Sequence, residues 1–146
     1  MEGHCSCNRL HYRVEKKPMI VHCCHCSWCQ RETGSAFVIN AVIETDAVKM
    51  LSGTSETIDT PSASGKGQKI TRCNVCHVAV WSQYSGAGEN IRFLRVGTLE
   101  NPDECPPDVH IYTSTKLDWV KLPDNASVVP EYYTPSEVWS DEAKLR

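Results

Sequence analysis

Hydrophobic and polar residues alternate over much of the chain with the period of two that is expected for β-strands. Leu10, Tyr12 and Val14 alternate with polar side chains, which is typical of a strand with one buried face. Residues 37–43 are mostly apolar, and we interpret this short run as a strand buried on both faces. Further strands are predicted at 48–50, 78–84, 91–96 and 109–112. The pattern therefore predicts a mainly β fold.

Helical signals are few. Ser27–Thr33 is predicted to form one or two turns, with Ser27 as the N-cap and Gly34 as the stop. Residues 136–144 are predicted to form a solvated helix that Ser136 caps. The helices are thus expected to be short additions to the sheets.

Two segments lack the periodicity of either element. Residues 60–67 are rich in Ser, Gly and Pro and predict a loop, while three prolines argue against regular structure over residues 101–108. The chain has no internal repeat and no recognisable linker. We therefore expect residues 1–146 to form a single domain.

Charge and composition narrow the class of function. The formal net charge is −3, which argues against nucleic acid as a partner and against attachment to anionic lipid. No apolar run approaches the roughly 18 residues of a transmembrane helix. Residues 1–5 lack the apolar core of a signal peptide, so we expect a cytoplasmic location in which thiols stay reduced.

The nine cysteines are the main chemical signal. Eight of them fall into three groups, which are Cys5 with Cys7, Cys23 to Cys29 with four cysteines, and Cys73 with Cys76. Pairs of cysteines separated by one or two residues place two sulfurs on one side of a turn, and two such pairs complete the tetrahedral ligand set of zinc. The first and third groups together predict a structural zinc site that ties distant parts of the chain together.

The middle group has a different composition. Cys24, Cys26 and Cys29 supply three sulfurs within six residues, and three protein ligands leave one position open, as a catalytic zinc requires. Cys23 could replace Cys24 in this set, although alternation along an extended segment favours Cys24. Alternatively, these thiols could form a redox or disulfide cluster.

Several motifs together resemble the glutathione-dependent formaldehyde-activating enzyme family. The motifs that carry the resemblance are Gly3-x-Cys5-x-Cys7 with Tyr12, Cys24-His25-Cys26-x2-Cys29 followed by Gly34-Ser35-Ala36-Phe37, Cys73-x2-Cys76, Gly97-Thr98-Leu99, Pro107, His110-Ile111 and Trp119. They extend over about 120 residues. In this sequence Asn8 and His77 stand where the family usually has glycine, and both residue types tolerate the positive φ that such a turn needs.

The resemblance implies a fold, an activity and a set of ligands. The fold would be Mss4-like, with coiled antiparallel sheets. Two zinc ions per chain are implied, a structural one held by Cys5, Cys7, Cys73 and Cys76 and a catalytic one held by Cys24, Cys26 and Cys29. The implied activity is that of a carbon-sulfur lyase, which adds glutathione or a similar thiol to formaldehyde or a related small aldehyde, giving S-(hydroxymethyl)glutathione, or cleaves such adducts.

Two alternatives to the enzyme remain open. The scaffold could act as an Mss4-like binding module that needs only the four-cysteine site, or as a glutathione carrier or sensor without turnover. Among single residues, Cys105 is expected to be an incidental thiol, His25 to lie outside the ligand set, and His110 and Trp119 to pack or form hydrogen bonds. Four cations are weaker candidates for binding a substrate carboxylate, namely Arg31, Lys66, Lys69 and Arg72.

Overall fold

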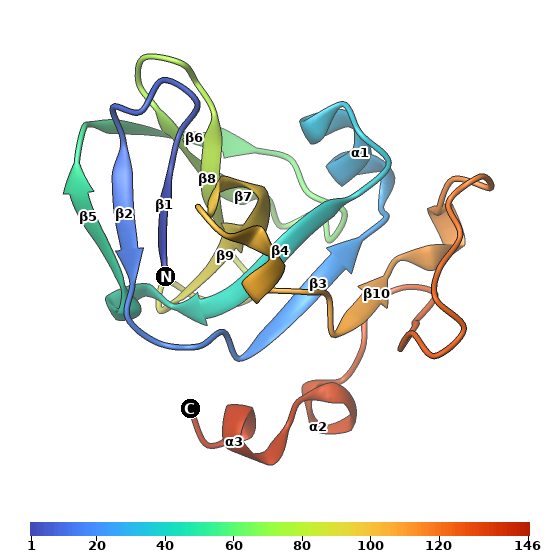
Figure 1. Ribbon diagram of the computed structural model, residues 1–146. Helices are drawn as coiled ribbons and strands as arrows, with labels where there is room; N and C mark the ends of the chain where they lie inside the picture. The colour runs from blue at the N-terminus through green and yellow to red at the C-terminus, as the bar shows by residue number, and fades with distance from the viewer.

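Two β-sheets make up most of the protein. In the computed structural model, which describes residues 1–146, the sheets lie side by side with the helices at the periphery (Figure 1). The small sheet has the order β1-β2-β5, with bounds Glu2–His4, His11–Val14 and Val48–Ser52. The large sheet has the order β10-β3-β4-β9-β8-β7-β6, with bounds Val109–Ile111, Ile20–Cys24, Val38–Glu44, Ile91–Arg95, Ala79–Tyr84, Gln68–Cys73 and Ser55–Thr60. The mainly β prediction is confirmed.

One strand pair in the large sheet is parallel. Strand β10 runs parallel to β3, with Ile111 opposite Cys24, whereas all other neighbouring strands are antiparallel. On its other side β3 pairs with β4, where Cys24 lies opposite Val38. The end of β3 is therefore held between two strands, and this fixes the start of the segment that carries the middle cysteine group.

Strand β4 separates two hydrophobic clusters. Ala41 and Ile43 belong to a cluster that also contains Tyr12 and Trp81, whereas Val42 packs in a second cluster on the opposite face. Because successive side chains of a strand point to opposite faces, a strand between two cores must be apolar at almost every position. This confirms the interpretation of residues 37–43 as a strand buried on both faces.

Helix α1 (Ser27–Thr33) follows the prediction in its extent but not in its N-cap. Cys26, not Ser27, is the N-cap, because its Sγ accepts the backbone N–H of Cys29 at 3.3 Å. Gly34 ends the helix with φ of 64°, a conformation that costs glycine little. The N-cap of α1 is therefore one of the cysteines of the middle group.

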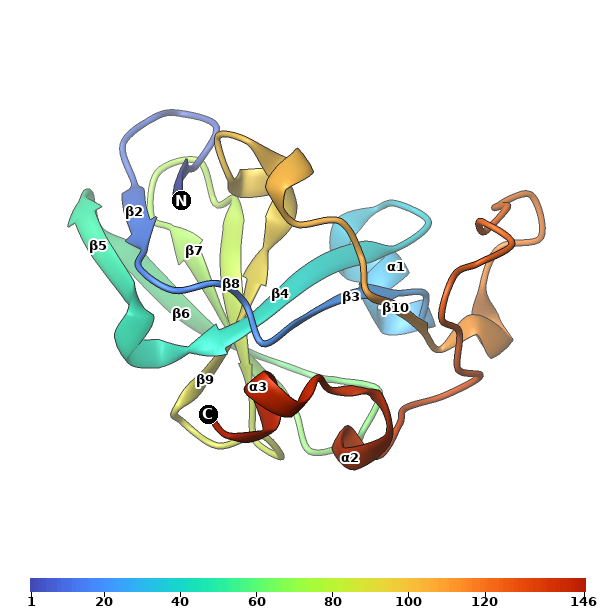
Figure 2. The same cartoon turned by 60° about the horizontal axis from the view of Figure 1, so that its bottom comes forward.

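The predicted continuous helix at 136–144 is wrong. The chain forms two short helices instead, α2 (Pro135–Val138) and α3 (Asp141–Lys144). Trp139 has an extended backbone, and the Ser140 side chain caps α3 by accepting the N–H of Ala143. Figure 2 shows both helices outside the large sheet. The segment is also not fully solvated, because Ala143 packs in the second cluster.

Smaller differences from the sequence pattern concern loops and strand ends. The four 3-10 turns are η1 (Thr45–Ala47), η2 (Val96–Thr98), η3 (Pro102–Glu104) and η4 (Thr113–Thr115). Val96 thus leaves the strand predicted at 91–96, and one turn interrupts the irregular segment 101–108. Met50 is exposed although alternation placed it with Val48. The loop at 60–67 is confirmed, and Ser62 within it is buried.

Candidate functional site

A four-sulfur cluster joins two cysteine pairs that lie far apart in the sequence. Cys5 and Cys7 lie in the turn after β1, and Cys73 and Cys76 lie at the end of β7 and in the turn that follows. Their four Sγ atoms all lie within 4.8 Å of one another, with 3.5 Å from Cys5 to Cys7 and 3.8 Å from Cys7 to Cys73. Sulfurs around a tetrahedral zinc lie about 3.8 Å apart. The cluster therefore has the ligand type and spacing that suit zinc.

The two turns that carry this cluster have the left-handed backbone expected for them. Asn8 has φ of 58° and His77 has φ of 61°, and their N–H groups donate to the carbonyl oxygens of Cys5 and Cys73 at 3.1 and 3.0 Å. The expectation that both residues tolerate this turn is confirmed. Backbone N–H groups also reach two of the sulfurs, since Leu10 N–H donates to Cys5 Sγ at 3.4 Å and Val75 N–H donates to Cys73 Sγ at 3.5 Å. Such bonds stabilise thiolates.

A second cluster holds three sulfurs, from Cys24, Cys26 and Cys29. Cys24 ends β3, Cys26 caps α1, and Cys29 lies in the first turn of that helix, so one short segment brings the three together. The Sγ atoms lie within 4.8 Å of one another, and Cys29 Sγ to Cys24 Sγ is 3.5 Å. We refer to Cys24, Cys26 and Cys29 as the sulfur trio.

Electrostatics favour one thiolate in the sulfur trio. Hydrogen bonds from the thiols of Cys24 and Cys29 lower the pKa of Cys26 to about 3, against the effect of burial, and N–H groups of Cys29 and Trp28 add to this. The bond with Cys26, the bond with Cys29 and burial raise the pKa of Cys24. The trio therefore carries negative charge at neutral pH, which is what a cation ligand set needs.

Arg95 on β9 is a buried cation near the sulfur trio. Its guanidinium donates to Asn40 Oδ1 at 2.7 Å and to Ser82 Oγ at 3.0 Å, and it is 6% exposed. None of the ion pairs in the structure includes Arg95. A buried charge needs an opposite charge nearby. The bond with Cys24 lowers the pKa of Cys29, but the bond with Cys26 and burial raise it to about 12 overall, and the charge of Arg95 is a smaller lowering effect.

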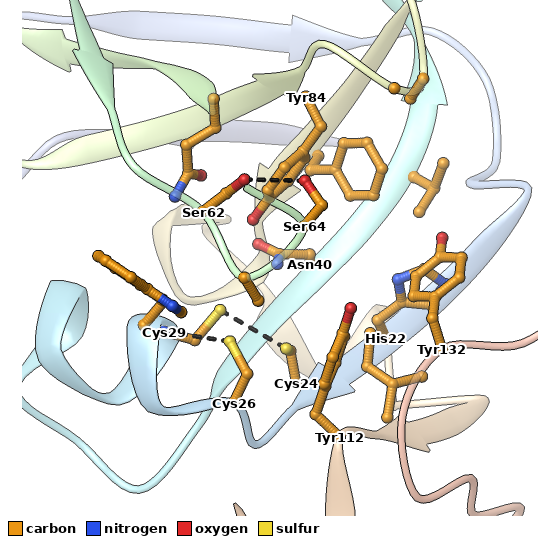
Figure 3. Close-up of a pocket in the computed structure, with 18 of the residues that line it drawn as sticks. His22, Cys24, Cys26, Cys29, Asn40, Ser62, Ser64, Tyr84, Tyr112 and Tyr132 are labelled. Atoms are coloured by element: carbon orange, nitrogen blue, oxygen red, sulfur yellow. Dashed lines mark hydrogen bonds between the residues drawn. The ribbon is translucent and has the colours of Figure 1, made fainter. Parts of the chain in front are cut away.

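A pocket of about 500 Å³ opens beside the sulfur trio. Cys24, Cys26 and Cys29 all line it, whereas no cysteine of the four-sulfur cluster does. Figure 3 shows the three sulfurs together, with the rings of Tyr84 and Tyr112 around the remaining space. Its volume is in the range of pockets that bind small organic ligands, about 300–1,000 Å³. The trio is therefore the cysteine cluster that adjoins a pocket of ligand size.

Tyrosines of the pocket are functional candidates that the sequence pattern did not identify. Burial raises the pKa of Tyr84 and of Tyr112, so both phenols keep their protons at neutral pH. Tyr112 has φ of 53°, which is unusual for a bulky residue, and its N–H donates to Glu131 O at 2.8 Å. A left-handed tyrosine directly after a short strand gives no local sequence signal.

A third group of possible ligands lies on the other face of β3. Cys23 Sγ is 3.5 Å from His25 Nε2, which is 3.0 Å from His110 Nδ1 on β10. The structure thus groups Cys24, and not Cys23, with Cys26 and Cys29, because alternation along β3 sends the two side chains to opposite faces. The expectation that His25 lies outside the trio and that His110 forms hydrogen bonds is confirmed.

The remaining candidates have separate surroundings. Lys66 lines the pocket beside the sulfur trio. Arg72 does not line this pocket and forms an ion pair with Glu32. Neither Arg31 nor Lys69 lines the pocket. Cys105 is buried with its Sγ 3.5 Å from Met1 Sδ, as expected for an incidental thiol, whereas Trp119 is 72% exposed and does not pack as expected.

The fold and the two sulfur clusters define a mainly β protein with cysteine sites suited to zinc. Residues 1–115 match the family described as glutathione-dependent formaldehyde-activating enzyme, and the chain belongs to this family. The resemblance and the Mss4-like fold expected from it are thereby confirmed.

Two further comparisons concern single proteins. No curated protein matches the chain. A crystal structure of a Rhodobacter sphaeroides protein is similar, with a TM-score of 0.52 and 20% sequence identity over 68% of this chain and 88% of that chain. At this identity the similarity concerns the fold alone. No helix here has the length and apolar character that crossing a bilayer requires.

Proposed function

We propose that the protein is a zinc-dependent carbon-sulfur lyase that adds glutathione, or a similar thiol, to formaldehyde or a related aldehyde, and that cleaves such adducts in reverse. In this proposal Cys24, Cys26 and Cys29 hold the catalytic ion, and Cys5, Cys7, Cys73 and Cys76 hold a structural one. The observation that carries it is that three sulfurs line a ligand-sized pocket while the four-sulfur cluster does not.

The donor set fits zinc at both places. Thiolate ligands favour zinc over harder divalent cations such as magnesium and calcium. Four thiolates make a closed zinc site, whereas three leave one position open for a substrate. Bound at the sulfur trio, zinc would supply a positive centre that favours the deprotonated form of an incoming thiol. Family membership supports glutathione and formaldehyde as substrates, since the family is named for them.

The protein residues around the trio have roles that follow from their positions. Arg95 offsets the negative charge of the three sulfurs from within the core, held in place by Asn40 and Ser82. The phenols of Tyr84 and Tyr112 stay protonated and line the pocket, so they can donate hydrogen bonds to the oxygen that becomes negative when sulfur adds to the carbonyl carbon. The S–C bond forms as the carbonyl π bond breaks, and the thiol proton ends on that oxygen.

Proton-exchange spectroscopy of formaldehyde with glutathione tests the proposal. We expect the zinc-loaded protein to accelerate exchange between free glutathione and its hydroxymethyl adduct, and Cys29→Ser to return the rate to that of the uncatalysed reaction. Cys105→Ser is the matched control, because Cys105 is a buried thiol outside the clusters. An unchanged rate in Cys29→Ser contradicts the catalytic role. Binding of glutathione in calorimetry without any acceleration would favour the carrier over the enzyme.

A further inference from the structure

The pocket beside the sulfur trio is much larger and more apolar than formaldehyde requires. Of its 22 lining residues 14 are hydrophobic, a count that includes the three cysteines of the sulfur trio. Among the others are Tyr84 at the end of β8 and Ile91 and Phe93 in β9. Formaldehyde has a single carbon, whereas a volume of about 500 Å³ accommodates a molecule of many heavy atoms. Most of the pocket would therefore stay unused if formaldehyde were the aldehyde.

Glutathione alone does not explain the lining. The tripeptide carries two carboxylates and one ammonium group, which need cationic and anionic partners when they leave water. Lys66 is the only Lys or Arg residue that lines the pocket, and no Asp or Glu lines it. The charged ends of glutathione are thus expected at the solvent-facing rim, while the apolar interior takes an uncharged organic group.

Part of the apolar wall comes from residues outside the segment that matches the family. The family match ends at residue 115, and Tyr132, Pro135 and Trp139 beyond it line the pocket. Two sheet-like bonds hold the start of this segment against β10, from His110 N–H to Ser127 O at 2.8 Å and from Val129 N–H to His110 O at 2.9 Å. Part of the wall is therefore formed by residues that lie beyond the family match.

Aromatic contacts fix the position of this wall. The Tyr133 hydroxyl forms a hydrogen bond with His22 and accepts Trp139 Nε1–H at 2.8 Å. The ring of Tyr132 stacks on Tyr133 with a centroid distance of 4.7 Å and meets His22 edge-on. Figure 3 shows Tyr132 beside His22 on the side of the pocket away from Cys29. These contacts present aromatic surface to the interior instead of polar groups.

We propose that the pocket binds the apolar group of an aldehyde larger than formaldehyde, of aliphatic or aromatic character, and that Tyr132 and Trp139 determine this preference. The inference rests on the proposed function and names its substrate class. Glutathione sulfur adds to the aldehyde carbon, the carbonyl π bond opens, and the thiol proton passes to the oxygen, giving a hemithioacetal. Its R group lies against the aromatic wall while the glutathione ends face solvent.

Stable thioethers of glutathione test the proposal by binding instead of turnover. S-hexylglutathione and S-methylglutathione share the tripeptide and differ only in the apolar group that would occupy the pocket. Because each buried CH₂ favours binding, we expect the hexyl compound to bind the zinc-loaded protein at least tenfold more tightly in calorimetry. Equal affinities, or no binding of either compound, would overturn the proposal.

Variants of the wall assign the preference to its residues. Tyr132 is 49% exposed, so Tyr132→Ala removes wall surface at little risk to the fold, and we expect S-hexylglutathione to bind several-fold more weakly while S-methylglutathione is unchanged. Trp139→Ala is the second variant and should act in the same direction. Trp119→Ala, at an exposed tryptophan outside the pocket, is the matched control. Unchanged hexyl affinity in both wall variants contradicts the role of this segment.

The outcome is separable from that of the proposed function. Acceleration of formaldehyde exchange that depends on Cys29, together with equal affinities for the two thioethers, leaves the lyase in place and removes only the larger aldehyde. If the zinc-loaded protein does not accelerate exchange but binds the hexyl compound tightly, the apolar site stands and the catalytic proposal fails.

Discussion

At the scale of single residues, cysteine spacing carries more information than any other sequence feature. The separations within Cys5-x-Cys7 and Cys73-x2-Cys76 identify two turns that each bring two sulfurs together, and the structure places all four within 4.8 Å. Arg95 and Tyr112 lacked such a signal, because their importance depends on burial and on contacts from distant strands. A residue can therefore be predicted for the site when its chemistry is local, and not when its neighbours are supplied by the tertiary fold.

Gly3 offers a test of packing next to the four-sulfur cluster. A Cβ at this position would lie 2.3 Å from the Tyr12 hydroxyl oxygen and 2.6 Å from the Thr98 carbonyl oxygen, and Tyr12 is fully buried. We expect Gly3→Ala to lower the free energy of unfolding by about 1–3 kcal/mol, measured by urea denaturation. Gly97→Ala is the control, since nothing lies within 4 Å of its Cβ. Equal stability of the two variants would contradict this packing.

At the scale of elements, the sequence pattern succeeds where a strand shows either clear alternation or a continuous apolar run. The alternation at Leu10–Val14 led directly to β2, and the apolar run at 37–43 led to β4. Strands β3 and β6 gave neither signal. Buried β3 contains His22 and two cysteines instead of a continuous apolar run, and β6 is mostly polar and exposed along nearly its whole length. The helix expected at 136–144 breaks because the extended backbone of Trp139 separates two turns with their own caps.

The contact between β3 and β10 yields a prediction about the sulfur trio. His25 lies between Cys24 and Cys26, and its Nε2 is 3.0 Å from His110 Nδ1, so β10 holds the segment that carries two of the three sulfurs. Loss of such a positioning contact typically weakens metal affinity about 10–100-fold. We expect His110→Ala to release one zinc per chain at lower chelator concentration, followed with a colorimetric zinc indicator.

Cys23→Ser is the companion variant for this contact. In our account Cys23, His25 and His110 form hydrogen bonds and hold no ion, so Cys23→Ser keeps the zinc content of the parent protein. A zinc ion lost from Cys23→Ser alone would contradict this account and make that group a metal site of its own.

At the scale of the whole molecule, contacts between distant segments determine what the site can bind. The four-sulfur cluster joins two cysteine pairs that lie 66 positions apart or more. The C-terminal segment folds back onto β10 and the pocket. Sequence analysis anticipated the first of these long-range links, because the paired cysteines mark both of its ends. It did not anticipate the second, because the aromatic residues near the C-terminus become a wall only when they dock against His22 and Tyr133.

The C-terminal segment is also held by an ion pair with a pH signature. The Arg146 guanidinium contacts both carboxylate oxygens of Glu44, at 2.9 and 2.5 Å, and lowers the pKa of Glu44 from about 4.5 to about 2. Because the folded state binds this proton less tightly than the unfolded state, the pair stabilises the protein above pH 4.5, and this contribution is lost as the pH falls toward 2.

Urea denaturation at several pH values measures this contribution. We expect Arg146→Ala to be less stable than the parent at pH 7, with a difference that shrinks as the pH falls from about 5 to about 3. Lys144→Ala, whose ammonium pairs with the exposed Asp141, is the control and should show little effect at any pH. A difference for Arg146→Ala that stays constant from pH 7 to pH 3 would argue against the ion pair.

Metal content measured by native mass spectrometry tests the central claim most directly, namely that the sulfur trio and the four-sulfur cluster each hold one zinc ion. The account predicts two zinc ions per chain in the parent and one in Cys26→Ser, with the fold retained. It predicts a strongly destabilised protein for Cys73→Ser, because the zinc ion in the four-sulfur cluster holds the two sheets together. A parent chain with a single zinc ion that Cys26→Ser retains would contradict the account.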